Sequence, residues 1–321
     1  MIFSGLAENI TNPALLFFLL GIIAVQLKSD LQIPESSSKF ISIYLLFSIG
    51  FKGGQELSHS AISGELIWSI VAGVLLAATV PLLAFFILKR RLSIENSGAI
   101  AAAYGSVSAV TFVTAISFLE FQQVEFGGHM IAVMAVMEAP AIVVGVLLIN
   151  LYNKTDKNRP SCKSVLYHSV TNGSVVLIMG SLIIGFLASD KQAQGIEPFT
   201  TDIFKGFLAV FLLDMGITSG KQLSVMVKKG LYPFLFSTLM PFFNGLVALF
   251  ISMQITDSPG NQLLFALLGA SASYIAVPAA MKNAVPKANP SLYLPMALGI
   301  TFPINVIIGI PFYYQIIQNA G

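Results

Sequence analysis

Charged side chains are scarce in this sequence. Lys and Arg number 17 and Asp and Glu 15, so charged residues make up only 10% of the 321, whereas 55% are hydrophobic. Soluble globular domains carry about 25% charged residues, which excludes an ordinary soluble protein. A net charge of +2 is too small to indicate nucleic acid as a partner. Each crossing of a bilayer takes roughly 20 apolar residues and about ten such segments fit, so the sequence predicts an all-α polytopic membrane protein.

Cysteine and histidine are scarce as well. The single Cys162 excludes a disulfide framework and any CxxC motif. His59, His129 and His168 are far apart and lack metal-ligand spacing, so no transition-metal site is predicted. An HExxH motif and a nucleophile paired with a base are also missing. We therefore expect no enzyme activity, no catalytic residue and no cofactor other than a coupling ion.

Proline and glycine mark the places where apolar segments end, for example at Gly53-Gly54, Pro160, Pro198 and Pro259-Gly260. The predicted spans are roughly 12–28, 38–57, 65–88, 94–119, 128–152, 164–189, 199–221, 230–253, 260–284 and 291–317, with boundaries good to about 2–4 residues. All 17 Lys and Arg except Lys52, Lys191 and Lys205 follow odd-numbered spans. By the positive-inside rule these connections are cytoplasmic, which places both termini outside the cell (inner or plasma) membrane.

The two halves of the chain resemble each other. Gly50 aligns with Gly216, Ser106 with Ser271 and Pro140 with Pro303, at nearly one offset along the sequence. With about five spans on each side of a basic linker, the second half must enter the membrane in the opposite sense, which is an inverted repeat. The predicted units are residues 1–152 (first repeat), 153–163 (cytoplasmic linker) and 164–321 (second repeat).

Two apolar spans, the fourth and the ninth, are interrupted by small polar runs at 104–111 and 269–275. Lipid cannot hydrogen-bond a loosened backbone, so such breaks persist only where protein or a water-filled cavity satisfies them. Two half-helix N-termini meeting at the bilayer midplane would form an anion site without Lys or Arg. The predicted substrate-binding residues are Gly105, Ser106, Val107, Ser108, Ala270, Ser271, Ala272 and Ser273.

The same breaks would expose carbonyl oxygens to a monovalent cation, and Glu138 adds an intramembrane carboxylate. The predicted sodium ligands are Ser108, Thr111, Glu138, Ser271 and Ser273. Other interpretations stay open. The small residues are also typical of a helix-packing surface, and Glu138 or Asp214 is also compatible with a buried structural acid.

Several segments of the sequence resemble the SbtA family of sodium-dependent bicarbonate transporters nearly from end to end. They are Asn12-Pro13-Ala14-Leu15, Gly50-Phe51-Lys52-Gly53-Gly54, Gly105-Ser106-Val107-Ser108, Glu138-Ala139-Pro140-Ala141, Lys287-Ala288-Asn289-Pro290-Ser291-Leu292-Tyr293 and Gly299-Ile300-Thr301-Phe302-Pro303-Ile304. The resemblance implies a gate domain from spans 1, 2, 6 and 7, a core domain with crossed broken helices, a homotrimer, and inward movement of bicarbonate with sodium.

The sequence departs from that family at three places. Tyr274 stands where cyanobacterial members have Asp, and Ala109-Val110 stands where Gly-Ser is familiar. Fewer polar ligands imply fewer bound sodium ions or another small anion. The short linker weakens the implication that a PII-like regulator docks on the cytoplasmic face.

The predicted function is a sodium-coupled symporter that takes up bicarbonate or a similar small monoanion by alternating access. One alternative is a carrier of the same fold that couples another small carboxylate to protons through Glu138. A passive channel or a sensor module is an alternative of a different class.

Overall fold

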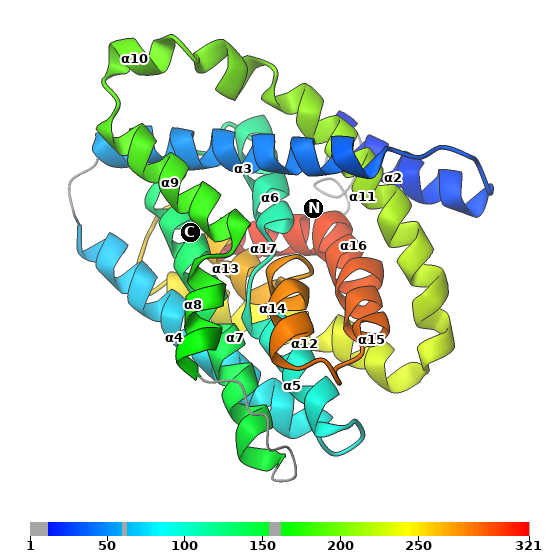
Figure 1. The fold of residues 1–321 in the computed structure, drawn as a ribbon. Coiled ribbons are helices and arrows are strands. Elements are labelled where there is room, and N and C mark those ends of the chain that lie inside the picture. The colour runs from blue at the N-terminus through cyan, green and yellow to red at the C-terminus, as the bar shows by residue number, and fades with distance from the viewer. Residues whose placement is uncertain (1–11, 60–62, 154–161, 321) are drawn as a thin grey trace.

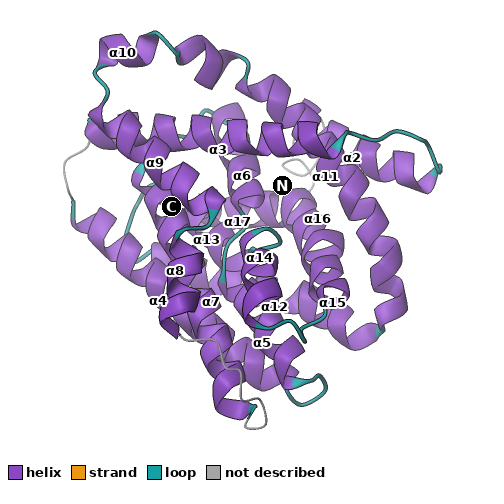
Figure 2. Ribbon diagram, in the orientation of Figure 1, coloured by secondary structure: helices purple, strands orange, loops and turns teal. Residues whose placement is uncertain are grey.

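The computed structural model describes residues 12–59, 63–153 and 162–320. This part of the chain folds into helices joined by short loops, and it contains no strand (Figure 2). Its helical stretches that are long and apolar enough to cross a membrane number 6: Gly64–Leu88, Ile94–Phe121, His129–Tyr152, Pro198–Met226, Leu231–Ser252 and Pro290–Ala320. A bent pair of helices raises the number to 7 if it forms one span. These stretches agree with the predicted all-α polytopic membrane protein.

The helices before the linker are α2 (Pro13–Gln26), α3 (Glu35–Ser58), α4 (Gly64–Leu88), α5 (Ile94–Gly105), α6 (Ala109–Phe121) and α7 (His129–Tyr152). Most begin with a polar cap: the side chains of Asn12, Ser63, Ser93 and Ser108 each accept a hydrogen bond from the first turn of the following helix. The predicted interruption of the fourth span is present, because α5 ends at Gly105 and α6 begins at Ala109.

The helices after the linker begin with α8 (Cys162–Val170), α9 (Gly173–Leu187), α10 (Asp190–Gln194), η1 (Pro198–Asp202), α11 (Phe204–Met226), η2 (Val227–Lys229) and α12 (Leu231–Ser252). They continue with α13 (Pro259–Ala270), α14 (Ala276–Ala284), α15 (Pro290–Pro295), η3 (Met296–Thr301), α16 (Phe302–Ile304), η4 (Asn305–Gly309) and α17 (Ile310–Ala320). The predicted interruption of the ninth span lies between α13 and α14.

Two details of the second half differ from the prediction. The span predicted at 164–189 is not straight, because α8 and α9 meet at an angle of 56°. Asn172 is the N-cap of α9, and its side chain accepts a hydrogen bond from the Ser174 N–H. The helix α8 begins inside the predicted linker 153–163, of which residues 154–161 lie outside the described part. The number of membrane crossings and their directions stay predictions.

Two helix pairs bring the two halves of the chain into contact. The helix α3 packs against α9, and α2 packs against α11 (Figure 1). A Cβ on Gly50 of α3 would clash with the backbone of Ile178 in α9. A Cβ on Gly216 of α11 would clash with the backbone of Phe18 in α2. Gly50 and Gly216, which align in the sequence, therefore have the same role: each lets two helix backbones approach closely.

Candidate functional site

The two breaks lie against each other although the sequence separates them widely. The Ser273 N–H donates to the Ala103 carbonyl oxygen at 2.8 Å, and the Ser108 N–H donates to the Ser271 hydroxyl at 3.0 Å. Both bonds use backbone groups that a continuous helix would have satisfied within itself. Each break therefore completes the hydrogen bonding of the other, which is what a broken helix in lipid requires.

Serine side chains also organise the helices that leave the breaks. Ser108 is the N-cap of α6, and its hydroxyl accepts from the Thr111 N–H at 3.2 Å. The Ser273 hydroxyl accepts from the Val277 N–H of α14 at 3.3 Å. Ser106 differs from both: its hydroxyl is buried and finds no hydrogen-bond partner among the described residues. Buried polar side chains rarely lack a hydrogen bond, which sets Ser106 apart from the other two serines.

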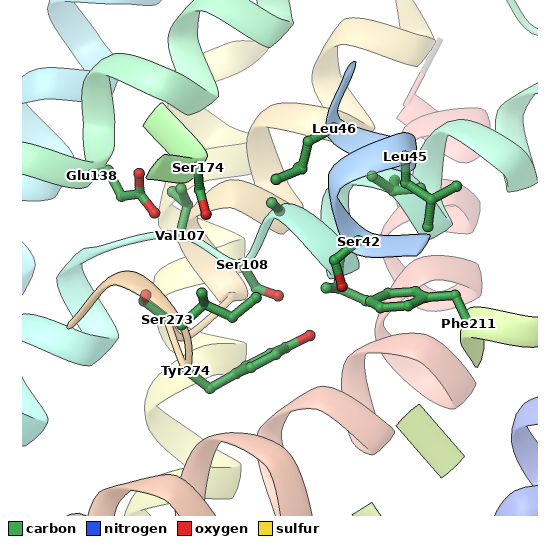
Figure 3. Close-up of a pocket in the computed structure, with 14 residues that line it drawn as sticks. Ser42, Leu45, Leu46, Val107, Ser108, Glu138, Ser174, Phe211, Ser273 and Tyr274 are labelled. Atoms are coloured by element: carbon green, nitrogen blue, oxygen red, sulfur yellow. The ribbon is translucent and has the colours of Figure 1, made fainter. Parts of the chain in front are cut away.

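A hollow with about 460 Å³ of empty space opens where the breaks meet the neighbouring helices (Figure 3). The breaks and the helices α3, α6, α7, α9 and α11 all contribute residues to its lining. Of the predicted substrate and sodium residues, Val107, Ser108, Ser273 and Glu138 line this hollow. The other predicted residues, Gly105, Ser106, Thr111, Ala270, Ser271 and Ala272, are buried around the breaks and do not line it.

Three polar or aromatic residues that α3, α9 and α11 bring to the hollow were not predicted. They are Ser42 of α3, Ser174 of α9 and Phe211 of α11. Ser42 also donates to the Ser38 carbonyl oxygen within its own helix, as serines in many helices do. Nothing in the sequence sets these residues apart, since their place at the hollow depends on how α3, α9 and α11 pack against the breaks.

Glu138 brings a carboxylate to the hollow from the middle of α7. The residue is 9% exposed, and its carboxylate points into the hollow beside Ser174 and Val107 (Figure 3). Among the described residues it forms no hydrogen bond and no ion pair. The interpretation of Glu138 as a structural acid bonded to a neighbouring helix therefore finds no bond to support it.

Tyr274 reaches across the hollow from the second break. Its hydroxyl lies 3.9 Å from the Met215 sulfur of α11, and its ring meets Phe302 edge to face at 5.9 Å. In Figure 3 the hydroxyl points toward Ser42 and away from Glu138. The Tyr274 side chain thus fills the space between the second break and α11.

Behind the second break, side chains from the last helical stretch satisfy the backbone. The Asn305 amide donates to the Ala270 carbonyl oxygen at 2.7 Å, at the end of α13. Thr301 donates to the Ser237 carbonyl oxygen at 2.8 Å and shares a 2.8 Å hydrogen bond with the Tyr104 hydroxyl. These buried bonds fix the ends of α5 and α13 in place.

Asp214 belongs to a different part of the molecule. Its carboxylate accepts from the Ser38 hydroxyl, so it joins α11 to α3 and does not line the hollow. This contact favours the structural interpretation of Asp214. Within the described ranges, no group of three or more His, Cys, Asp or Glu side chains is placed to hold a metal ion.

Comparison with known proteins gives one result that spans the chain. Residues 13–318 match the model of the Na+-dependent bicarbonate transporter superfamily. No curated protein matches the sequence. The family match covers both breaks, Glu138 and the helices that enclose the hollow. The chain therefore belongs to the Na+-dependent bicarbonate transporter superfamily and is a multi-pass membrane transport protein.

Proposed function

We propose that this protein imports bicarbonate, or a similarly small monoanion, together with sodium by alternating access. The observation that carries the proposal is the unpaired, buried Glu138 carboxylate in a hollow built by two broken helices. A buried carboxylate without a partner is expensive in a membrane and is expected to have a function. The family name supports sodium and bicarbonate as the transported pair.

The anion subsite follows from the start of α6. The first N–H groups of a helix have no acceptor within the helix, and the helix end carries a partial positive charge. Ala109 and Val110, which form the first turn of α6, line the hollow. Their side chains are apolar, so backbone N–H groups would hold the anion. The Ser106 hydroxyl does not line the hollow, but it is buried in the same break and has no partner among the described residues, so it is the proposed further donor.

The need for a cation subsite follows from the negative charges that would meet in the hollow. Glu138 and a bound anion would repel each other in one hollow unless a cation lies between them. The Ser108 and Ser273 hydroxyls, which line the same hollow, supply further oxygen atoms. Sodium bound there raises the affinity for the anion, and the anion raises the affinity for sodium by the same factor. This reciprocity would couple the two fluxes.

The proposed transport cycle moves a core, which carries the breaks, against a gate formed by α2, α3, α8, α9 and α11. The hollow lies between these two groups of helices, as alternating access requires. The equivalent glycine crossings at Gly50 and Gly216 support the inverted repeat of about ten spans. We extend the proposal to outward-facing termini and to a homotrimer joined through the gate.

Uptake by proteoliposomes tests the proposal. The purified protein is reconstituted, and accumulation of radiolabelled bicarbonate is followed with an inward sodium gradient or with potassium in its place. We expect concentrative uptake with sodium and only leakage with potassium. Equal uptake in both salts would refute the coupling, and uptake that stops at equilibrium would favour a passive channel.

A proton-coupled carrier of a small carboxylate is the second candidate, and it rests on the same unpaired Glu138. An acid in that position can carry a proton as well as bind a cation. An inward pH gradient without sodium, applied with formate, acetate and bicarbonate in turn, separates the two candidates. Uptake driven by the pH gradient alone would replace sodium with protons as the coupling ion.

A further inference from the structure

A second hollow lies away from the breaks, where the end of α4 meets the beginning of α12. It has about 810 Å³ of empty space and is lined by Leu83, Phe86, Ile87, Arg90, Arg91 and Tyr232. Three of these side chains are apolar, two are basic and none is acidic. We call this hollow the α4–α12 groove. It combines an apolar wall with a cationic rim.

The two arginines at the rim have no acidic partner. Among the described residues, neither Arg90 nor Arg91 forms an ion pair with a carboxylate. The Arg91 guanidinium lies 5.3 Å from the centre of the Tyr232 ring, and the Tyr232 hydroxyl donates to the Ile87 carbonyl oxygen at 2.9 Å. Arg91 is therefore positioned by an aromatic ring that is itself anchored to α4.

The preceding basic residue is used differently. The Lys89 ammonium lies 4.0 Å from the centre of the Tyr152 ring and 4.3 Å from that of Phe86. Tyr152 belongs to α7, so Lys89 is used in a contact between α4 and α7, and it is not among the residues that line the groove. The arginines are left as the cationic groups of the groove, and their planar guanidinium groups suit the oxygens of a phosphate better than an ammonium does.

The apolar wall of the groove continues along the outside of α4. Leu83, Phe86 and Ile87 are 52%, 42% and 44% exposed, on a helix of 25 residues that is long enough to cross a membrane. Leu231 and Leu235 of α12 are 69% and 43% exposed as well. Exposed apolar side chains in this position face lipid, and the arginines at the helix end lie at the level of the headgroups.

We infer that the α4–α12 groove binds one anionic phospholipid. Arg90 and Arg91 contact the phosphate, and an acyl chain lies against Leu83, Phe86 and Ile87. A soluble phosphate would use only the rim, whereas a lipid uses both the rim and the wall. The positive-inside prediction puts this end of α4 in the cytoplasmic leaflet, where anionic lipids attract basic residues. The inference is independent of the proposed transport function.

Lipid binding to the purified full-length protein tests the inference. Native mass spectrometry and thermal unfolding in detergent are measured with phosphatidylglycerol and with phosphatidylcholine of the same acyl chains. The test variant is Arg90→Gln with Arg91→Gln. The matched control is Lys28→Gln with Lys39→Gln, which removes the same charge from the connection after the first predicted span, predicted to lie on the same side and distant in the sequence from the groove.

We expect phosphatidylglycerol to bind at least tenfold more tightly than phosphatidylcholine to the wild type and to the lysine control. The arginine variant should lose that preference. A Leu83→Asn variant, which keeps both arginines, should weaken phosphatidylglycerol binding severalfold if an acyl chain lies on the wall. All substituted side chains are exposed or partly exposed, so the monodispersity of each variant can be checked before binding is measured.

Three outcomes would overturn the inference. Equal phosphatidylglycerol binding by the arginine variant and the wild type would show that the lipid binds elsewhere. Equal binding of the two lipids by the wild type would remove the phosphate from the recognition. Full competition by inorganic phosphate at millimolar concentration, with no effect of Leu83→Asn, would replace the lipid with a soluble anion.

Discussion

The two broken segments occupy equivalent places in the sequence but differ in what surrounds them. The first break faces the hollow, with Glu138 of α7 beside it and no bond to the carboxylate. Thr301 is the residue that aligns with Glu138 in the second half, and it lies behind the second break in a chain of buried hydrogen bonds. Of two positions that align in the sequence, one thus carries a group available to a ligand, and the other is part of the hydrogen-bonded framework.

Glu138→Gln is expected to have the largest effect on sodium-driven uptake, because it removes the available charge without changing the size of the side chain. Loss of a buried charge that pairs with an ion costs about 3–5 kcal/mol, so sodium-driven uptake should fall by about 100-fold or more. Labelled bicarbonate uptake in proteoliposomes measures it. The control is Glu35→Gln, whose carboxylate is 84% exposed and pairs only with Lys39.

The glutamine variant also separates the candidate functions. Full sodium-driven uptake by Glu138→Gln would remove Glu138 from the coupling. Loss of pH-driven uptake with sodium-driven uptake intact would assign Glu138 to proton transport.

Thr301→Val tests the residue that aligns with Glu138 in the second half and that belongs to the hydrogen-bonded framework. It leaves the Tyr104 hydroxyl and the Ser237 carbonyl oxygen buried without their bonds. Stability should fall by about 1–3 kcal/mol, seen as a lower unfolding temperature in detergent. Thr238→Val is the control, because the Thr238 hydroxyl donates only within its own helix. If Thr301→Val kept the stability and lost the sodium dependence, Thr301 would be a ligand and the two halves would be chemically alike.

Tyr274→Asp restores the residue type expected from the resemblance and makes the second break more like an ion site. An added carboxylate at the hollow should increase the sodium-to-bicarbonate flux ratio by about one ion, which dual-label uptake measures. Tyr274→Phe is the matched control, since it keeps the contact with Phe302 and loses only the hydroxyl. An unchanged ratio in a well-folded aspartate variant would show that Tyr274 does not set the ion count.

The positions of the breaks could be predicted from the sequence because their cause is local. Small polar residues interrupt an apolar run at 104–111 and again at 269–275, and the structure ends helices at Gly105 and Ala270. The bend before Gly173 also had a local signal, Thr171-Asn172-Gly173, which is typical of a turn and which the span prediction passed over.

The residues that α3 and α9 bring to the hollow could not be predicted from the sequence, since their position depends on tertiary packing. Ser42 and Ser174 reach the site only because α3 and α9 cross closely at Gly50 and bring both serines to the breaks. A serine in an apolar helix looks the same in the sequence whether it faces lipid, another helix or a ligand. The difference between Glu138 and Thr301 likewise depends on which neighbours each side chain meets.

Ser106→Ala should have the smallest effect, because it removes only the hydroxyl oxygen. Since the Ser106 hydroxyl has no partner among the described residues, its removal should leave the protein as stable as before or slightly more stable. If that hydroxyl bonds the anion, apparent bicarbonate affinity should fall by about threefold to tenfold, as expected for one hydrogen bond of about 0.5–1.5 kcal/mol. The comparison is with Ser97→Ala, whose hydroxyl is also buried and without a partner among the described residues but lies inside α5, well before the first break. Equal effects of the two substitutions on bicarbonate affinity would mean that the first break contributes only its backbone to the anion.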